Sequence, residues 1–175
     1  YPDYLDICIA LTGRAPRSGS HLDEGRHASL LIEVEAPQQA DDSFWPLLGY
    51  HVGLLAGSDI PLLCGLERSA ADSDALKAFG AAFATTSAAP MFHIAGVTPE
   101  APDVASALGG QAPTRQLRVS LADLLDSWWE LNGADSAEVS LVALGNPHCS
   151  ATELARLAEL CAGRQRHPDT ALVVT

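Results

Sequence analysis

The sequence predicts an α/β fold in three layers, with a largely parallel sheet that carries helices on its faces. Two patterns support this: short apolar segments alternate with helical segments of about ten residues, and 47% of the 175 residues are hydrophobic. This length is enough for one domain with a sizeable core, and no internal repeat is present. We therefore expect one layered α/β body.

The expected elements follow one another from the amino end. An apolar pattern of helical spacing from Tyr4 to Leu11 predicts a first helix that ends at Gly13. The later strands are expected at 28–35, 60–66, 91–95, 116–119, 138–144 and 171–175. Helices are expected between them, at 43–56, 74–85, 99–108, 121–131 and 152–162. Parallel strands need crossovers of this kind.

The segment 139–153 places reactive side chains between a strand and a helix. The apolar strand at its start is expected to be buried, and Ser150 with Glu153 has the form of a capping box that opens the next helix. His148 and Cys149 lie in the gap between the two elements. A helix N-terminus there favours anions and thiolates.

Two other strand-to-helix turns carry polar side chains. One ends in Asp72 and Ser73, either of which can cap the next helix. In the other, 91–101, Thr98 is expected to be the cap and Glu100 to lie in the first helical turn. With right-handed crossovers the three turns share one edge of the sheet, and their helix starts converge on a small carboxylate ligand.

A polar loop, 19–27, precedes the first strand and contains Ser20, His21 and Asp23. Such a run is usually a solvated loop. The functional alternative is a substrate loop in which His21 and Asp23 supply acid–base or hydrogen-bonding groups.

Other polar and aromatic residues have a structural explanation. His93 is most simply a core histidine, and Glu100 is explained by the favourable field of a helix N-terminus. Trp128 and Trp129 are explained by packing in the core and at the surface, and His51 by a hydrogen bond in the core.

Ten Lys and Arg against 22 Asp and Glu give a net charge of −12, which repels the phosphates of nucleic acid and of anionic lipid. No apolar run reaches the roughly 20 residues that span a bilayer, and no signal-peptide pattern is present. We therefore expect a cytoplasmic protein with neither nucleic acid nor membrane as its partner. The four cysteines are expected to be reduced and mostly buried.

Both ends of the chain are typical of the interior of a longer sequence. The chain begins without Met, inside an apolar helical pattern, and stops in the segment 171–175, which is typical of a buried strand. We expect it to be a segment of a longer polypeptide.

Four blocks of the sequence resemble the aconitase X family, in the same order along nearly the whole chain. They are LDICIALTGRAPRSGSHLDEGRHA, FWPLLGYHVGLLAG, FHIAGVTPEAP and LGNPHCSATELARLAELCAGR, in which G-V-T-P-E-A and G-x-P-H-x-S are the most specific phrases. The resemblance implies an aconitase-like fold. It also implies that residues 1–175 are the middle of a large subunit or fused chain, and that the flanking regions and a small swivelling subunit or domain complete the active site.

Members of this family are hydro-lyases that use protein-bound iron, as an iron–sulfur cluster or as a single iron ion. The resemblance implies a dehydratase of a small hydroxy carboxylate, in which iron polarises the leaving hydroxyl while a base removes a proton. The block L-T-G-R-A-P…H-L-D-E favours the branch that converts cis-3-hydroxy-L-proline to a pyrroline carboxylate. The alternative within the family is a phosphomevalonate dehydratase. The segment alone is expected to be inactive.

The candidate site residues combine this resemblance with the turns described above. The candidate catalytic residues are His21, Asp23 and His148, and the candidate substrate-binding residues are Ser20, His93, Thr98, Glu100 and Asn146. Some relatives carry Cys in place of Asn146, so Cys149 is the candidate iron ligand here, with the other ligands outside the segment.

Two hypotheses come from other classes of protein. One is a catalytically silent binding or scaffold domain without iron. The other is a cysteine-dependent enzyme with Cys149 as nucleophile and His148 or His93 as base, which is disfavoured because adjacent residues in a bend seldom point at one another. Iron analysis of the full-length protein separates the dehydratase from both.

Overall fold

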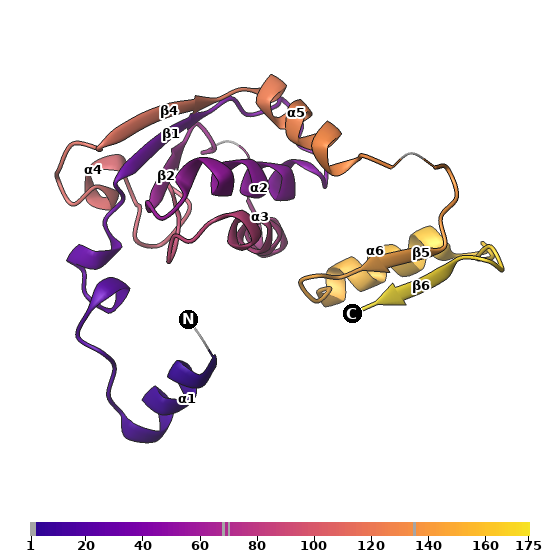
Figure 1. Ribbon diagram of the computed structural model, residues 1–175, viewed down its shortest axis with the longest axis horizontal. Helices are drawn as coiled ribbons and strands as arrows, with labels where there is room; N and C mark the ends of the chain where they lie inside the picture. The colour runs from indigo at the N-terminus through magenta and orange to yellow at the C-terminus, as the bar shows by residue number, and fades with distance from the viewer. Residues whose placement is uncertain (1–2, 68, 70, 135) are drawn as a thin grey trace.

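The computed structural model describes residues 3–67, 69, 71–134 and 136–175 (Figure 1). The strands are β1 (Leu30–Val34), β2 (Pro61–Cys64), β3 (His93–Ile94), β4 (Arg115–Val119), β5 (Leu141–Leu144) and β6 (Ala171–Val174). The helices are α1 (Asp3–Thr12), α2 (Phe44–Ala56), α3 (Ser73–Thr86), α4 (Val104–Ala107), α5 (Leu121–Leu131) and α6 (Ala151–Cys161), with 3₁₀ turns η1 (Gly19–His21) and η2 (Glu24–Arg26). No helix among these residues is long and apolar enough to cross a membrane.

A four-stranded sheet in the order β3-β2-β1-β4 forms the main body, and its strand pairs are parallel. Alternate residues of β1 face opposite layers, as the period of a strand requires. Leu30 and Ile32 belong to the larger core under α2 and α3, whereas Leu31 packs in the smaller core on the other face. The predicted α/β layers are therefore confirmed.

Helices α2 and α3 cover one face of this sheet and approach each other very closely (Figure 1). A Cβ atom on Gly49 would lie 2.3 Å from the carbonyl oxygen of Phe79. Glycine at position 49 is therefore what allows the two helices to pack at this distance.

The opposite face is covered by α4 and the turn that precedes it. The predicted helix 99–108 is wrong at its start, because the structure places the cap at Asp103, whose side chain accepts from Ser106 N at 2.7 Å. Thr98 instead bonds the backbone of Ile94. The proline at 102 disfavours a helical conformation at Ala101, so the helix begins only after it.

The elements β5, α6 and β6 form a separate parallel β-α-β unit, here called the C-terminal unit, at the right of Figure 1. All eight strand residues are exposed, and α6 has no buried residue. The expectation that the strands 138–144 and 171–175 are buried is therefore wrong for the described residues. One helix and two strands are too few to cover both faces of a parallel sheet.

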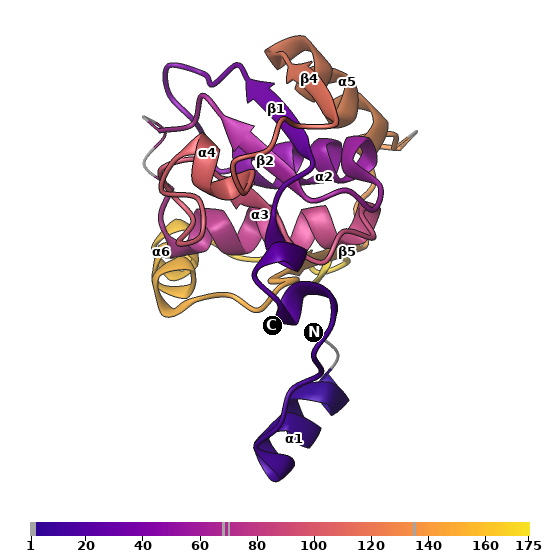
Figure 2. The ribbon, with the colours of Figure 1, turned by 90° about the vertical axis from the view of Figure 1, so that its left-hand side faces the viewer.

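Several apolar side chains and cysteines are exposed. Figure 2 shows α1 lying apart from the main body, with Tyr4 at 84% exposure. The four cysteines are free as predicted, but two are exposed and two half-buried, so "mostly buried" is wrong. Trp128 and Trp129 are 42% and 67% exposed, so they lie at the surface rather than in the core. His51 makes the predicted hydrogen bond, with Ser127 Oγ at 2.9 Å.

Candidate functional site

The predicted site residues other than His21 and Thr98 fall into two groups rather than one. The first group, here called the Arg26 cluster, contains Ser20, Asp23, Arg26, His93 and Glu100. The second group, here called the Cys149 turn, is the segment 145–149, which carries three of the predicted residues. The expectation that all three turns share one sheet edge is wrong, because β5 belongs to the second sheet.

The loop that carries His21 and Asp23 is compact, with η1 and η2 folded against each other. A Cβ atom on Gly25 would lie 2.0 Å from the carbonyl oxygen of Gly19, so only glycine permits this contact. The loop therefore has a defined backbone course rather than the irregular form of a solvated run.

Arg26 lies at the centre of the first group, with its side chain only 25% exposed. Its guanidinium donates to Ser20 O at 3.1 Å and to an oxygen of Asp23, and its Nε lies 2.8 Å from Glu100 Oε1. The Nε–H is poorly aligned with that oxygen, so Glu100 pairs with the charge of this buried atom without giving it a well-directed hydrogen bond. Burial lowers the pKa of the guanidinium, but the hydrogen bond to Asp23 and the charges of Glu100 and Asp23 outweigh it and raise the pKa.

His93 fixes the backbone of this cluster from β3. Its Nε2 lies 2.7 Å from Arg26 O, and since a carbonyl can only accept, Nε2 carries the proton. The ring is 2% exposed, so the expectation of a core histidine with a satisfied hydrogen bond is confirmed. The same ring also lines a cavity of about 150 Å³ with Asp23, Arg26, His27 and Glu100.

Arg26 was not among the site residues predicted from the sequence. The only local signal is a single cation directly after Asp23, Glu24 and Gly25, the glycine that closes the loop. Thr98 lies in the turn that presents Glu100, but it bonds to Ile94 rather than to the cluster. Glu100 is not in a helix, so its predicted explanation by a helix N-terminus is wrong.

The Cys149 turn lies where β5 ends, beside Thr175, the residue that follows β6. Cys149 N donates to Thr175 O at 2.8 Å, and Thr175 Oγ1 donates to Gly145 O at 2.6 Å. The predicted capping box is confirmed, because Ser150 Oγ accepts from Glu153 N and Glu153 Oε2 accepts from Ser150 N. Asn146 and His148 are exposed.

The N-termini of α3 and α6 meet at a polar junction. Lys77 Nζ donates to His148 O at 3.2 Å and to Glu153 Oε2 at 2.5 Å, and Ser150 Oγ donates to Asp74 Oδ2 at 2.8 Å. The hydrogen bond from Lys77 is the main reason why the pKa of Glu153 is lowered. Carboxylates therefore already occupy these helix starts, which do not offer an open site for an anion.

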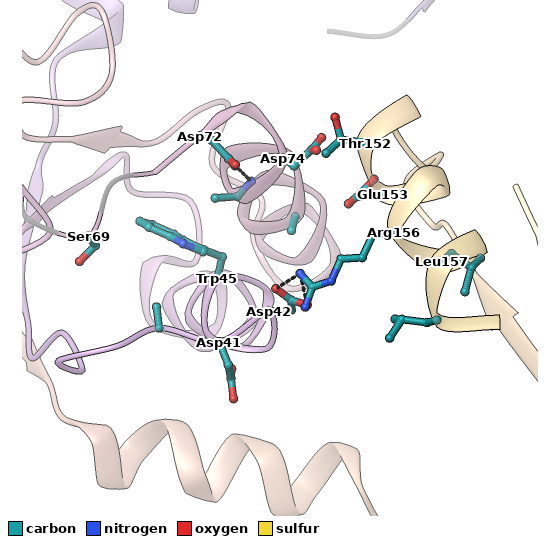
Figure 3. Close-up of a pocket in the computed structure, with 14 residues that line it drawn as sticks. Asp41, Asp42, Trp45, Ser69, Asp72, Asp74, Thr152, Glu153, Arg156 and Leu157 are labelled. Atoms are coloured by element: carbon teal, nitrogen blue, oxygen red, sulfur yellow. Dashed lines mark hydrogen bonds and ion pairs between the residues drawn. The ribbon is translucent and has the colours of Figure 1, made fainter. Parts of the chain in front are cut away.

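A cleft of about 480 Å³ lies beside this junction, between the main body and α6 (Figure 3). Asp41, Asp42 and Trp45 line one side, and Glu153 and Arg156 line the other. The ion pair between Arg156 and Asp42, at 3.0 Å, crosses it. The contacts described here between the two bodies are hydrogen bonds and ion pairs.

The described residues do not form an iron site by themselves. Among them, no group of three or more His, Cys, Asp or Glu side chains is placed to hold a metal ion. Cys64 lies at the carboxyl end of β2, where burial, followed by the charges of Glu67 and Glu33, raises the pKa of its thiol. The thiolate that a metal requires is therefore disfavoured at Cys64.

The arrangement gives little support to a cysteine-dependent enzyme. His93 belongs to the Arg26 cluster, where its Nε2–H is committed to Arg26 O. Among the described residues, no hydrogen bond joins the side chain of Cys149 to an imidazole.

Comparison with known proteins identifies relatives along the whole chain. The family description "Aconitase X second domain" matches residues 28–129. The chain is 59% identical over 175 residues to the cis-3-hydroxy-L-proline dehydratase of Pseudomonas aeruginosa and 53% identical to that of Hypocrea jecorina. Each match covers 100% of the chain but 30% of the relative, so the chain spans less than a third of their length.

More distant relatives carry a different substrate in their names. The chain is 36% identical to the phosphomevalonate dehydratase large subunit of Methanothermobacter thermautotrophicus. This match covers 87% of the chain and 36% of that subunit. The fold is similar to the crystal structure of the holo form of Thermococcus kodakaraensis aconitase X, with a TM-score of 0.77 and 29% identity. That match covers 95% of this chain and 41% of the other.

Proposed function

We propose, since the chain belongs to the aconitase X family, that the complete protein is a hydro-lyase that dehydrates cis-3-hydroxy-L-proline. The observation that supports this most is the high identity with two hydroxyproline dehydratases across every residue of the chain. The phosphomevalonate dehydratases are more distant. In this reaction a proton leaves the carbon beside the carboxylate, the hydroxyl leaves the neighbouring ring carbon, and the two depart as water.

In this proposal the Arg26 cluster and the Cys149 turn are two parts of one substrate platform. His21, Asp23 and His148 are the acid–base candidates, since imidazole and carboxylate side chains are the groups that most often transfer protons or accept hydrogen bonds in such sites. Proposed substrate contacts are Ser20, His93, Thr98, Glu100 and Asn146. The support for the first part is its compact loop and its cavity.

The experiment is an assay of the complete protein with both candidate substrates. Formation of pyrroline carboxylate from cis-3-hydroxy-L-proline is followed by ultraviolet absorbance, and a phosphorylated mevalonate is offered in parallel. Turnover of hydroxyproline alone supports the proposal. Turnover of the phosphorylated mevalonate alone would assign the protein to the other branch. Activity with neither, in iron-loaded protein, would favour a scaffold domain.

The loop residues have a test of their own. Replacing His21 or Asp23 by Ala should lower kcat by about 100-fold, which is the lower end of what general acid–base groups contribute. Folding should be nearly unchanged, because Asp23 is exposed and neither side chain belongs to the buried core, and substitutions outside the core usually alter stability little. The matched control is Glu24→Ala in the same loop, which should keep full activity. Equal loss of folding and activity would indicate a structural loop.

Iron is proposed as the cofactor of the complete protein, with Cys149 as one ligand and the remaining ligands outside this chain. The support is the position of Cys149 directly before a capped helix. Cys149→Ser should lower the iron content per protein and change the visible spectrum, whereas Cys161→Ser, at an exposed thiol, should change neither. Unchanged iron in Cys149→Ser would remove it from the metal shell.

Two further features of the complete protein are proposals. A smaller swivelling subunit or domain closes the active site. This is compatible with the finding that the chain covers only 30% of the length of each hydroxyproline dehydratase. A cytoplasmic location is supported by the four unpaired cysteines. Size analysis of the purified complete protein and fractionation of its cells test these two statements.

A further inference from the structure

We propose that the Arg26 cluster recognises a zwitterion, with Arg26 receiving the carboxylate of the substrate and Glu100 receiving its ammonium group. This inference rests on the proposed function and narrows it, because it assigns the choice of an amino acid to two side chains. Neither side chain was assigned to a charged group of a substrate by the sequence pattern.

The charges of the Arg26 cluster favour a zwitterion over a dianion. One guanidinium is flanked by two carboxylates, because Asp23 hydrogen-bonds to Arg26 and Glu100 Oε1 lies 2.8 Å from its Nε. A ligand with two negative charges, such as a phosphate monoester, would be repelled by the carboxylate that Arg26 does not neutralise. A zwitterion has one positive group for Glu100 and one negative group for Arg26.

The Nε–H group of Arg26 is available for a better-aligned acceptor. Arg26 Nε is buried and has no aligned acceptor among the described residues, although Glu100 lies at ion-pair distance. A donor whose neighbouring acceptor is poorly aligned forms a weak hydrogen bond, so a ligand oxygen that lies in line with Nε–H is stabilising. The Glu100 side chain is 44% exposed and has room to turn.

These two facts define an exchange of partners. When Glu100 turns from Arg26 towards the ligand ammonium, it uncovers Nε–H, and the ligand carboxylate takes its place with an aligned hydrogen bond. Each cation keeps an anion throughout, and Asp23 continues to hold the other end of the guanidinium. The exchange therefore avoids an unpaired charge in a partly buried site.

The cavity beside the Arg26 cluster is preformed and small. Its volume is about 150 Å³, below the roughly 300–1,000 Å³ of pockets for drug-sized ligands, so it suits a single small amino acid. His93 holds the backbone of Arg26, and the ring of His27 lies against Gly109, where a Cβ atom would be 2.3 Å from His27 Nδ1. The walls are therefore fixed, and the selectivity depends on the charged groups.

The competing explanation is that the cluster only ties the loop 19–27 to the turn before α4. A tie of this kind would affect folding and turnover, but it would not distinguish two ring compounds of equal shape. The discriminating pair of probes is L-proline, which is zwitterionic and lacks the 3-hydroxyl, and cyclopentanecarboxylate, which has the same ring size without the nitrogen.

The experiment measures the affinities of the complete protein for L-proline and cyclopentanecarboxylate by calorimetry. The wild type should bind L-proline at least about 10-fold more tightly, as one hydrogen bond to a charged group predicts. In Glu100→Gln this ratio should fall close to one. Arg26→Lys should weaken both compounds by a similar factor, because both carry a carboxylate. Glu24→Gln, the control in the same loop, should retain the wild-type ratio.

The outcomes separate this inference from the proposed function. A wild-type ratio near one, a ratio unchanged in Glu100→Gln, or affinities unchanged in Arg26→Lys would each overturn the zwitterion site. Absence of hydroxyproline turnover by the wild type would overturn the proposed function instead. Binding by calorimetry requires no turnover, so the two results are read independently. Circular dichroism of each variant establishes that it is folded.

Discussion

The main body and the C-terminal unit are built from the same parallel β-α-β pattern, yet they differ in what surrounds the strands. In the main body, Leu30 and Ile32 are fully buried under α2 and α3, and Leu62 is fully buried in the core on the other face of the sheet. In the C-terminal unit every strand residue is exposed, and the described contacts to the main body are polar. The same local pattern therefore gives a packed core in one place and an uncovered sheet in the other.

The largest contrast should come from truncating one apolar side chain in each region. Phe79→Ala removes a fully buried ring that contacts Phe83 and Phe92, and should lower the free energy of unfolding by about 3–5 kcal/mol. Leu160→Ala, at 58% exposure, should cost less than about 0.5 kcal/mol. Urea denaturation followed by circular dichroism measures both. Equal losses would mean that the C-terminal unit is packed as tightly as the main body.

The second contrast tests the close approach of α2 and α3. Gly49→Ala adds a methyl group 2.3 Å from Phe79 O and should cost about 1–3 kcal/mol, since backbone cannot move aside easily. The control is Gly133→Ala between the two regions, where the nearest atom, Glu130 O, is 3.6 Å away. Thermal denaturation of the two variants compares them, and a stable Gly49→Ala protein would contradict the tight packing.

The third contrast uses two capping boxes, one in each region. Ser120→Ala on α5 and Ser150→Ala on α6 each remove an acceptor for a backbone N–H and should cost about 1 kcal/mol. Ser150→Ala also removes the hydrogen bond to Asp74, so amide exchange should accelerate in α6 and at the junction. Ser150→Thr keeps a hydroxyl that can accept from Glu153 N and donate to Asp74, and should protect α6. Unchanged exchange in Ser150→Ala would show that the cap is not needed.

The smallest effect should be the pH dependence of the junction. The pKa of Glu153 is lowered by hydrogen bonds from Lys77 and Ser150, and that of Asp74 by hydrogen bonds from Ser150 and Lys77. Because both pKa values are lowered, the two carboxylates contribute their full stability to the junction at a pH above their ordinary pKa values of 4.5 and 3.8. This stability is lost as the pH falls through the lowered pKa values. Solution scattering should therefore show a radius that increases progressively as the pH is lowered below the ordinary values. In Lys77→Met the radius should be larger already at pH 7, and high salt should act in the same direction.

Much of the fold could be predicted because it depends on local patterns. The strand at β1, the helix at α5 and the Ser150 cap all follow from periodicity and from side chains within three residues of one another. The start of α4 was misplaced because Thr98 and Pro99 have the form of a cap, whereas the chain reaches helical geometry only after the next proline. Local signals compete there, and the tertiary contacts of the turn decide.

The candidate site could be predicted only in part, because its centre is formed by contacts between distant residues. Asp23, His93 and Glu100 were candidates from their own turns, but the pairing of Arg26 with Glu100 depends on how β1 and β3 lie in the sheet. Burial of β5 and β6 was predicted wrongly for a related reason, since an apolar strand does not specify what covers it.

The uncovered sheet of the C-terminal unit has a consequence for handling the protein in solution. Within residues 136–175, β5 and β6 each pair on one side only, and Val142, Leu172 and Val173 are all exposed. An apolar, uncharged strand edge is a template for the strand of another molecule, which leads to growing aggregates rather than closed dimers. Solubility of the chain by itself is therefore governed by a few strand residues, and a lysine in place of Val173 is the change that most directly prevents such growth.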